Sequence, residues 1–203
     1  MQKLDRKFYC RDAVTLAEAL LGKVLVHKIN GQRLSARIVE TEAYMGVTDK
    51  AAHSYGGRRT PRVEVMYGEA GYAYVFMIYG MYNCFNIVCM EKDIPQAVLI
   101  RTCEPLEGLD QMTQNRYKKR YNELTKYQRK NLTNGPGKLC AALSLDRTHN
   151  GIDLCKNVLY LEDSEFPAFS MTKTTRVGID YAEEARDFLW RFYITGNEYV
   201  SVK

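Results

Sequence analysis

Short runs of alternating apolar and polar residues, separated by turn residues, dominate the chain. The first element is different, because its apolar positions recur at helical spacing. Asp12 is placed to cap a short helix with Leu16, Leu20 and Leu21 along one stripe. Gly22 is the type of residue that ends such a helix.

A β-hairpin is predicted immediately after this helix. Residues 23–29 and 33–44 have strand-like patterns, and Asn30-Gly31 between them is typical of a type I′ turn. The following segment, residues 47–64, is polar and irregular and contains two glycines. A long loop in a compact domain is more often functional than idle, which makes this segment a candidate part of a site.

A second hairpin is predicted within residues 70–90, and its tip is unusual. Gly80 and Met81 fit the central positions of a type II′ turn, with Tyr79 and Tyr82 flanking them. Hairpin tips normally carry polar turn residues, because they face water. Large apolar side chains at this tip therefore indicate either a binding role or packing against another subunit or another part of the chain.

The remainder of the chain alternates between strands and helices without repeats or an interdomain linker. Because hairpins dominate and βαβ spacing is absent, we expect one α+β domain over residues 1–203 with antiparallel pairing. The further elements expected are a strand in 93–108, a basic helical region 109–130, an apolar helix in 134–145, strands near 157–164 and 174–180, a helical patch at 181–188, and closing strands at 189–196 and 199–202.

Composition agrees with a folded globular protein, with 46% hydrophobic and 26% charged residues. The 15 tyrosines suit a wet interface or an ordinary half-buried sheet, and composition does not decide between these. Six cysteines lack any C-x-x-C pair and only three histidines exist, so no metal site is expected. No apolar run approaches the roughly 18–20 residues that span a bilayer. We expect reduced cysteines and a cytoplasmic protein without membrane contact.

The best candidates for chemistry lie in residues 34–44. If this segment is a strand, Glu40, Glu42 and Tyr44 share one face. Either these acids face solvent, or Glu42 lies in a cleft beside Tyr44 and serves as a general base. His53 would join them if the polar loop folds back over the strand, and otherwise it is a structural or solvated residue.

The net charge of +5 favours an anionic partner only if the cations are clustered. They are clustered in residues 116–130. Two further candidate phosphate contacts are Arg58, in the polar loop, and Lys138, at the start of a helix. A basic helix can also be simply a solvated face. Together with an apolar hairpin tip, however, the pattern indicates nucleic-acid binding, since minor-groove proteins insert apolar wedges between base steps. Enzymes that act on a base must likewise extrude it.

At this point the sequence resembles a known family. The alkyladenine (3-methyladenine or hypoxanthine) DNA glycosylases share seven ordered blocks that run from about Leu16 to Val202. The blocks are IVETEAYMG, AAHSYGGRRTPR, YVFMIYGMYNCFNIV, LIRTCEPLEGL, NGPGKLCAAL, RVGID and WRFYITG. The resemblance implies a single domain around a curved antiparallel sheet, with peripheral helices and a protruding hairpin that enters the minor groove.

The resemblance also implies an activity. Members of this family hydrolyse the N-glycosidic bond of damaged purines in double-stranded DNA and leave an abasic site, without a metal or cofactor. Their substrates are alkylated purines, hypoxanthine and ethenoadenine. The chain lacks the long N-terminal extension of mammalian members, so the resemblance favours a bacterial protein, expected to be a monomer associated with the nucleoid.

The roles implied near the reacting bond fall on five positions. Glu42 matches the base that activates water, and Arg101 with the backbone carbonyl of Val177 matches positions that place that water. Tyr44 matches the aromatic residue on one face of the flipped base. His53 matches a partner on the other face, which also donates a hydrogen bond.

Five further positions match the base pocket and the wedge. Phe76 stands where the mammalian pattern has a stacking tyrosine, so the ring is kept and the hydroxyl is lost. Asn86 matches the residue that excludes normal guanine. Tyr79 matches the intercalating residue, with Met81 and Tyr82 beside it.

One departure concerns residues 182–188, AEEARDF, which lack the tryptophan expected in that helix. Two other functions stay open from the residues alone. A non-catalytic protein that binds damaged nucleic acid would keep the wedge and the basic surface but not depend on Glu42. A small nucleoside hydrolase using Glu40 and Glu42 would have no need of a wedge.

Overall fold

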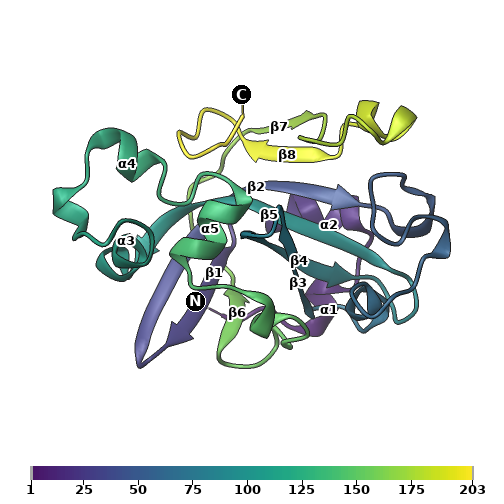
Figure 1. The fold of residues 1–203 in the computed structure, drawn as a ribbon, viewed down its shortest axis with the longest axis horizontal. Coiled ribbons are helices and arrows are strands. Elements are labelled where there is room, and N and C mark those ends of the chain that lie inside the picture. The colour runs from purple at the N-terminus through teal and green to yellow at the C-terminus, as the bar shows by residue number, and fades with distance from the viewer. Residues whose placement is uncertain (1, 203) are drawn as a thin grey trace.

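The computed structural model describes residues 2–202 (Figure 1). The strands are β1 (Val24–Ile29), β2 (Gln32–Tyr44), β3 (Ala73–Ile78), β4 (Tyr82–Cys89), β5 (Gln96–Glu107), β6 (Leu159–Glu162), β7 (Met171–Thr174) and β8 (Arg191–Ile194). The α-helices are α1 (Arg6–Tyr9), α2 (Ala13–Leu20), α3 (Leu109–Tyr117), α4 (Lys126–Lys130) and α5 (Pro136–Ala142).

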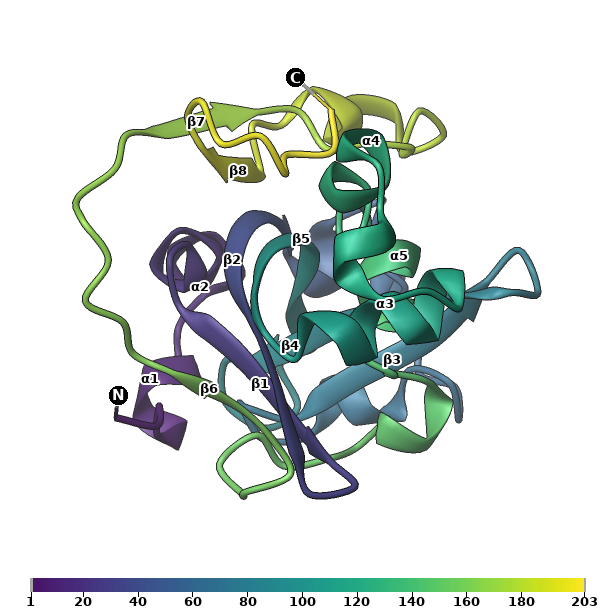
Figure 2. The same ribbon diagram turned by 90° about the vertical axis from the view of Figure 1, so that its left-hand side faces the viewer.

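All strands pair antiparallel in one sheet, in the order β3-β4-β5-β2-β1-β6, and β8 joins β2 and carries β7. The predicted α+β class with an antiparallel sheet is therefore confirmed. The long β2–β5 pair shifts register at three places, between 35 and 36, 38 and 40, and 40 and 41. Such bulges bend a strand and strengthen its twist, and Figure 2 shows the sheet curling while β7 and β8 lie across one end.

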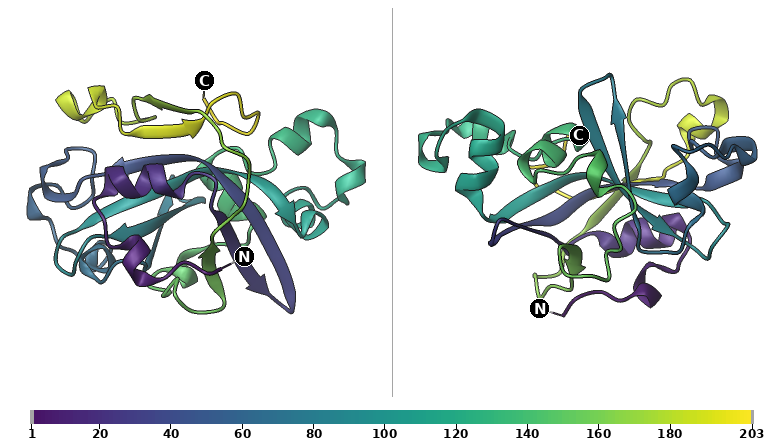
Figure 3. Two further views of the ribbon diagram at one scale, coloured as in Figure 1. Left: turned by 180° about the vertical axis from the view of Figure 1, so that it is seen from behind. Right: turned by 60° about the horizontal axis from the view of Figure 1, so that its bottom comes forward.

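The partner of β2 changes along its length, and this change creates the site. Residues 32–37 of β2 pair with β1, whereas residues 40–42 pair with β8. On its other edge β2 pairs with β5 from residue 35 to residue 44. Side chains near residue 42 therefore lie where three strands meet, and the C-terminal segment covers this region (Figure 3, left).

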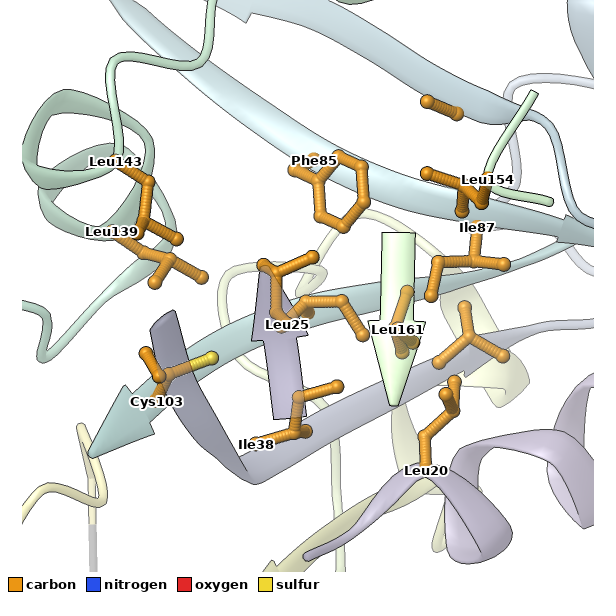
Figure 4. Packing of buried hydrophobic residues seen from close by; sticks show 14 of the residues in the cluster. Leu20, Leu25, Ile38, Phe85, Ile87, Cys103, Leu139, Leu143, Leu154 and Leu161 are labelled. Atoms are coloured by element: carbon orange, nitrogen blue, oxygen red, sulfur yellow. The ribbon is translucent and has the colours of Figure 1, made fainter. Parts of the chain in front are cut away.

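The main core lies between the sheet and the helices α2 and α5 (Figure 4). Leu20 from α2, Ile38 from β2, Phe85 from β4 and Leu139 from α5 are all completely buried in it. All six cysteines are free thiols, and four of them are buried. Among residues 2–202, no helix combines the length and apolar character needed to cross a membrane.

The predicted local signals at the first helix and first hairpin are confirmed. The carboxylate of Asp12 accepts a hydrogen bond from the Thr15 amide at 3.0 Å and caps α2. Asn30 and Gly31 both have the positive φ angles, 50° and 75°, that a type I′ turn requires.

The predicted type II′ turn at the second hairpin is wrong. Tyr79 and Gly80, not Gly80 and Met81, take the central positions, with φ of 51° and 70°, and the Met81 amide bonds the Ile78 carbonyl. The turn thus has the φ signs of type I′, whose twist matches that of the flanking strands. A tyrosine accepts a left-handed conformation here, which is unusual for a residue other than glycine, asparagine or aspartate.

Three other predicted elements need correction. The basic region 109–130 is two α-helices and a short 3-10 turn, because Lys118 adopts φ of 58° and ends α3. The strand expected in 174–180 stops at Thr174, and residues 199–202 form no strand. The helical patch at 181–188 is present as a 3-10 helix, Glu183–Asp187.

Candidate active site

The two acids of β2 are completely buried, so the alternative of a solvent-facing acidic strand is wrong. Oε1 of Glu42 accepts a hydrogen bond from the Val177 amide at 2.7 Å and forms an ion pair with Arg101 Nη1 at 3.2 Å. Its Oε2 accepts from the Tyr44 hydroxyl at 2.9 Å. Burial and the neighbouring carboxylate raise the pKa of Tyr44 well above its ordinary value, so this hydroxyl remains a donor.

Glu40 has a different environment on the same face. Its carboxylate accepts from Arg101 Nε at 3.1 Å, Arg191 Nη1 at 2.8 Å and the Ser201 amide at 2.9 Å. Thr102 and the Ser201 hydroxyl complete its hydrogen bonds. Every lone pair is directed at a structural partner, so Glu40 anchors Arg101 and the C-terminal segment to β2.

A third buried pair lies on the far side of Tyr44. Arg176 donates to both oxygens of Asp49, at 2.6 and 2.9 Å, and its guanidinium lies between the rings of Tyr44 and Trp190, about 5 Å from each. The 182–188 segment has no tryptophan, and the indole that contacts Arg176 comes from Trp190. The charge network thus balances three buried carboxylates (Glu40, Glu42 and Asp49) against three buried guanidinium groups (Arg101, Arg176 and Arg191). It has two parts, because Arg101 bridges Glu40 and Glu42 and Arg191 pairs with Glu40, whereas Arg176 pairs with Asp49.

A cavity of about 580 Å³ opens beside this network. That volume lies within the range of small-molecule pockets. Its lining contains six of the seven residues expected around the flipped base and the water, namely Tyr44, His53, Phe76, Asn86, Arg101 and Val177, but not Glu42. Glu42 lies directly behind this wall and touches three of the lining residues. At Val177 the backbone N–H contacts Glu42, whereas the resemblance implied a role for its carbonyl.

The polar loop 47–64 does fold back over the sheet and brings His53 into the cavity wall. The Ser54 hydroxyl donates to the Pro95 carbonyl at 3.0 Å and holds the loop there. The His53 ring lies 4.6 Å from the Phe76 ring, in an edge-on arrangement. Burial, followed by the charges of two nearby arginines, lowers the pKa of His53 to about 4, so the imidazole is neutral near pH 7.

The tautomer of His53 follows from its single hydrogen bond. Nδ1 lies 2.8 Å from the hydroxyl of Tyr74, a side chain that is almost completely buried. Among residues 2–202 the hydroxyl proton of Tyr74 has no other acceptor within hydrogen-bond distance, so Tyr74 donates and Nδ1 accepts. In a neutral imidazole the proton then lies on Nε2, which makes His53 a hydrogen-bond donor.

Asn86 lies at the base of the same wall, opposite Tyr74 in the β3–β4 pair. Its Nδ2 donates to the main-chain carbonyls of Tyr74 at 3.1 Å and Cys84 at 3.4 Å. These bonds fix the amide plane and leave Oδ1 as the group's remaining polar atom.

The end of the hairpin tip is exposed, so Tyr79 and Met81 are not packed against another part of this chain. Tyr79 is 86% exposed and Met81 67%, and Tyr79 also lines the cavity. Tyr82 is half exposed and packs on the first turn of α5, where a Cβ at Gly137 would lie 2.9 Å from the tyrosine ring. The tip is therefore supported at its base and free at its end.

The two candidate phosphate contacts differ in environment. Arg58 is exposed at the end of a short 3-10 turn. Lys138 is half-buried, and its Nζ donates to the side-chain oxygens of Asn131 at 2.7 Å and Asn134 at 3.2 Å. Burial and the nearby Arg116 charge lower the pKa of Lys138.

Sequence reasoning missed several residues that shape the cavity. Asp49 and Arg176 are separated by more than a hundred residues, and neither carries a motif that pairs it with the other. Tyr74 and Tyr181 were two tyrosines among 15. Alternation along β3 could have placed Tyr74 on the face of Phe76, but no signal in the sequence distinguishes Tyr181.

Comparison with known proteins identifies the class as DNA glycosylases. The family model for methylpurine-DNA glycosylase (MPG) matches residues 7–198. A Desulfitobacterium hafniense (strain Y51) protein is 61% identical over 203 residues, and a Clostridium acetobutylicum protein is 58% identical over 200; these alignments cover 100% and 98% of each chain. Both carry the name "Putative 3-methyladenine DNA glycosylase". The chain belongs to the methylpurine-DNA glycosylase family, which confirms the resemblance.

Proposed function

We propose that this protein excises damaged purines from duplex DNA as a monofunctional glycosylase, with Glu42 as the general base. The observation that carries the proposal is the position of the Glu42 carboxylate. It is held by Tyr44, Arg101 and the Val177 amide directly behind an aromatic cavity. In this proposal the carboxylate held directly behind the wall acts on the water and the sugar of a base bound inside the cavity.

The step requires only water and side chains. The bond from C1′ to the purine nitrogen breaks, its electron pair leaves with the base, and positive charge develops on the sugar. The Glu42 carboxylate stabilises that charge and accepts a proton from the attacking water. Arg101 bridges Glu42 and Glu40 and holds the carboxylate in place. We therefore propose no cofactor.

The absence of lyase activity is also part of the proposal. Cleavage of the DNA strand through a Schiff base requires an amine nucleophile. Among the described residues that line the cavity, none is a lysine. We expect the product to be an intact strand with an abasic site.

The cavity walls suit the substrate class. Tyr44 on one side and Phe76 with His53 on the other offer ring faces and edges to a flat base, and a cationic alkylated purine is attracted to such faces. A neutral base such as hypoxanthine or ethenoadenine needs protonation to leave. We assign Asn86, which is fixed at the base of the wall, to the exclusion of normal guanine.

The exposed tip and the cations supply the DNA contacts in this proposal. Tyr79, with Met81 and Tyr82, occupies the space of the extruded base, and Arg58 and Lys138 contact phosphates. The protein acts as a monomer. Since the relatives are bacterial, we place the activity in the cytoplasm, on nucleoid DNA.

Incubation of the purified protein with labelled duplexes tests this function. Each duplex carries one hypoxanthine, ethenoadenine, 3-methyladenine or 7-methylguanine, and an undamaged duplex is the control. We expect release of the free base, identified by mass, and a strand that breaks only after alkali. Tight binding of damaged duplex without base release would instead establish the non-catalytic alternative. Cleavage of free nucleosides would favour the hydrolase alternative.

A further inference from the structure

A second exposed aromatic residue lies at the mouth of the cavity. Tyr181 is 69% exposed and lines the cavity together with Tyr79. The two come from different parts of the fold, since Tyr79 lies in the β3–β4 turn and Tyr181 follows β7. The right-hand view of Figure 3 shows the hairpin and the segment between β7 and β8 rising on the same side of the molecule.

The backbone beneath Tyr181 is firmly held. The Ala182 amide bonds the Ile179 carbonyl at 2.9 Å, so Asp180 and Tyr181 are the central residues of a tight turn. Under this turn, Ala51, Ile179, Ala182 and Ala185 form a small separate core against which Tyr44 packs.

Two further contacts attach the same segment to the loop of His53. Lys50 Nζ bonds Glu183 at 2.6 Å and Glu184 at 2.8 Å. Arg176, at the start of the segment, is paired with the buried Asp49. The ring of Tyr181 is thus presented to solvent from a fixed support, while no hydrogen bond within residues 2–202 is recorded for its hydroxyl.

We propose that Tyr181 is a DNA-positioning residue that packs on the duplex across the cavity mouth from Tyr79. This inference rests on the proposed function, because the strand that delivers a base into the cavity must cross its mouth. Tyrosine offers a rigid ring with a polar end, and every base and deoxyribose offers an apolar face to it. Tyr79 fills the vacated stack, and Tyr181 holds the strand on the opposite rim.

Tyr127 provides a matched control. It is 75% exposed on α4, does not line the cavity, and has no assigned DNA contact, since the proposed function places the phosphate contacts at Arg58 and Lys138. Removing either ring leaves the core unchanged, so neither substitution to serine should alter the melting temperature. Any difference between the two variants then reports on the position of the ring rather than on its loss from the surface.

The probe is a duplex with a tetrahydrofuran abasic analogue, which has no base to release. We expect Tyr181→Ser to raise its Kd about tenfold, the lower part of the range for one lost aromatic stack. Tyr181→Phe should remain within about twofold of wild type, and Tyr127→Ser should bind as wild type does. On a hypoxanthine duplex, Tyr181→Ser should slow single-turnover excision at subsaturating protein and recover most of the rate at saturation.

Two results separate this inference from the proposed function. If wild type excises hypoxanthine but Tyr181→Ser binds as tightly as Tyr127→Ser does, the role of Tyr181 is wrong and the glycosylase remains. If wild type excises none of the four lesions, the proposed function fails whatever the binding data show. A rise in the Kd of Tyr181→Phe equal to that of Tyr181→Ser would also overturn the packing role, because the ring is retained.

Discussion

The Asp49→Asn variant should be much less stable than wild type, because both oxygens of the Asp49 carboxylate already accept hydrogen bonds that an NH2 group cannot accept. Oδ1 accepts from the Ala51 amide at 3.0 Å and from Arg176 at 2.9 Å. Oδ2 accepts from the Met45 amide at 3.0 Å and from Arg176 at 2.6 Å. Whichever way the asparagine amide turns, its NH2 group faces one backbone N–H and one guanidinium N–H.

The magnitude follows from burial. Asp49 is completely buried and Arg176 nearly so, and removing one partner of a buried ion pair costs about 3–5 kcal/mol, since the other charge is left uncompensated. For a chain of this length, each kcal/mol lowers the melting temperature by about 2–4 °C. Asp49→Asn should therefore melt about 6–20 °C lower than wild type.

Asp93→Asn is the control, because Asp93 makes an exposed 3.0 Å ion pair with Arg59. Exposed pairs contribute only about 0–1 kcal/mol, so its melting temperature should change by a few degrees at most. Thermal and urea unfolding, followed by circular dichroism, measure both variants. A stability of Asp49→Asn within about 1 kcal/mol of wild type would refute the idea that the charge network holds the segment before Val177 in place.

Three other outcomes are expected. Wild type should lose stability between pH 6.5 and 4, because His53 has a pKa near 4 when folded and is protonated more readily in the unfolded chain; His53→Gln should lose less stability over this range. Urea unfolding at pH 7 and 5 checks this, and equal pH dependence in both proteins would contradict it. Gly137→Ala should displace the Tyr82 ring and weaken binding to abasic duplex several-fold without lowering the melting temperature, since alanine favours the helix; unchanged affinity would show that the tip tolerates the shift. Arg58→Gln and Lys138→Gln should each reduce the slope of log K against log salt concentration by about 1, and an unchanged slope would remove that residue from the phosphate contacts.

Local patterns in the sequence predicted the elements around the site well. Alternation along residues 34–44 placed Glu40, Glu42 and Tyr44 on one face, and the structure agrees, since Arg101 contacts both acids and the Tyr44 hydroxyl bonds Glu42. The pattern could not decide whether that face is buried. The answer depends on Arg101, Arg191 and Ser201, which reach the two acids from distant segments.

Other features lacked a local signal. Residues 109–130 contain no proline, and the only glycine nearby precedes them, yet α3 ends at Lys118. The break lets the Asp110 carboxylate accept a hydrogen bond from the Tyr121 amide at 2.7 Å, a contact that forms only once the chain has turned. At the hairpin tip, turn chemistry favoured glycine in the first central position, but the hydrogen bond from the Met81 amide to the Ile78 carbonyl makes Tyr79 the first central residue.

The most direct test of the account compares Glu42→Gln with wild type on a duplex that holds one hypoxanthine opposite thymine. Single-turnover excision and equilibrium binding are measured on the same preparations. Since glutamine keeps the shape of the side chain but cannot accept the proton of water, excision should be nearly abolished while affinity for the damaged duplex stays close to that of wild type. Excision at the wild-type rate would contradict the role of Glu42 as base, and equal loss of excision and binding would make it a structural residue.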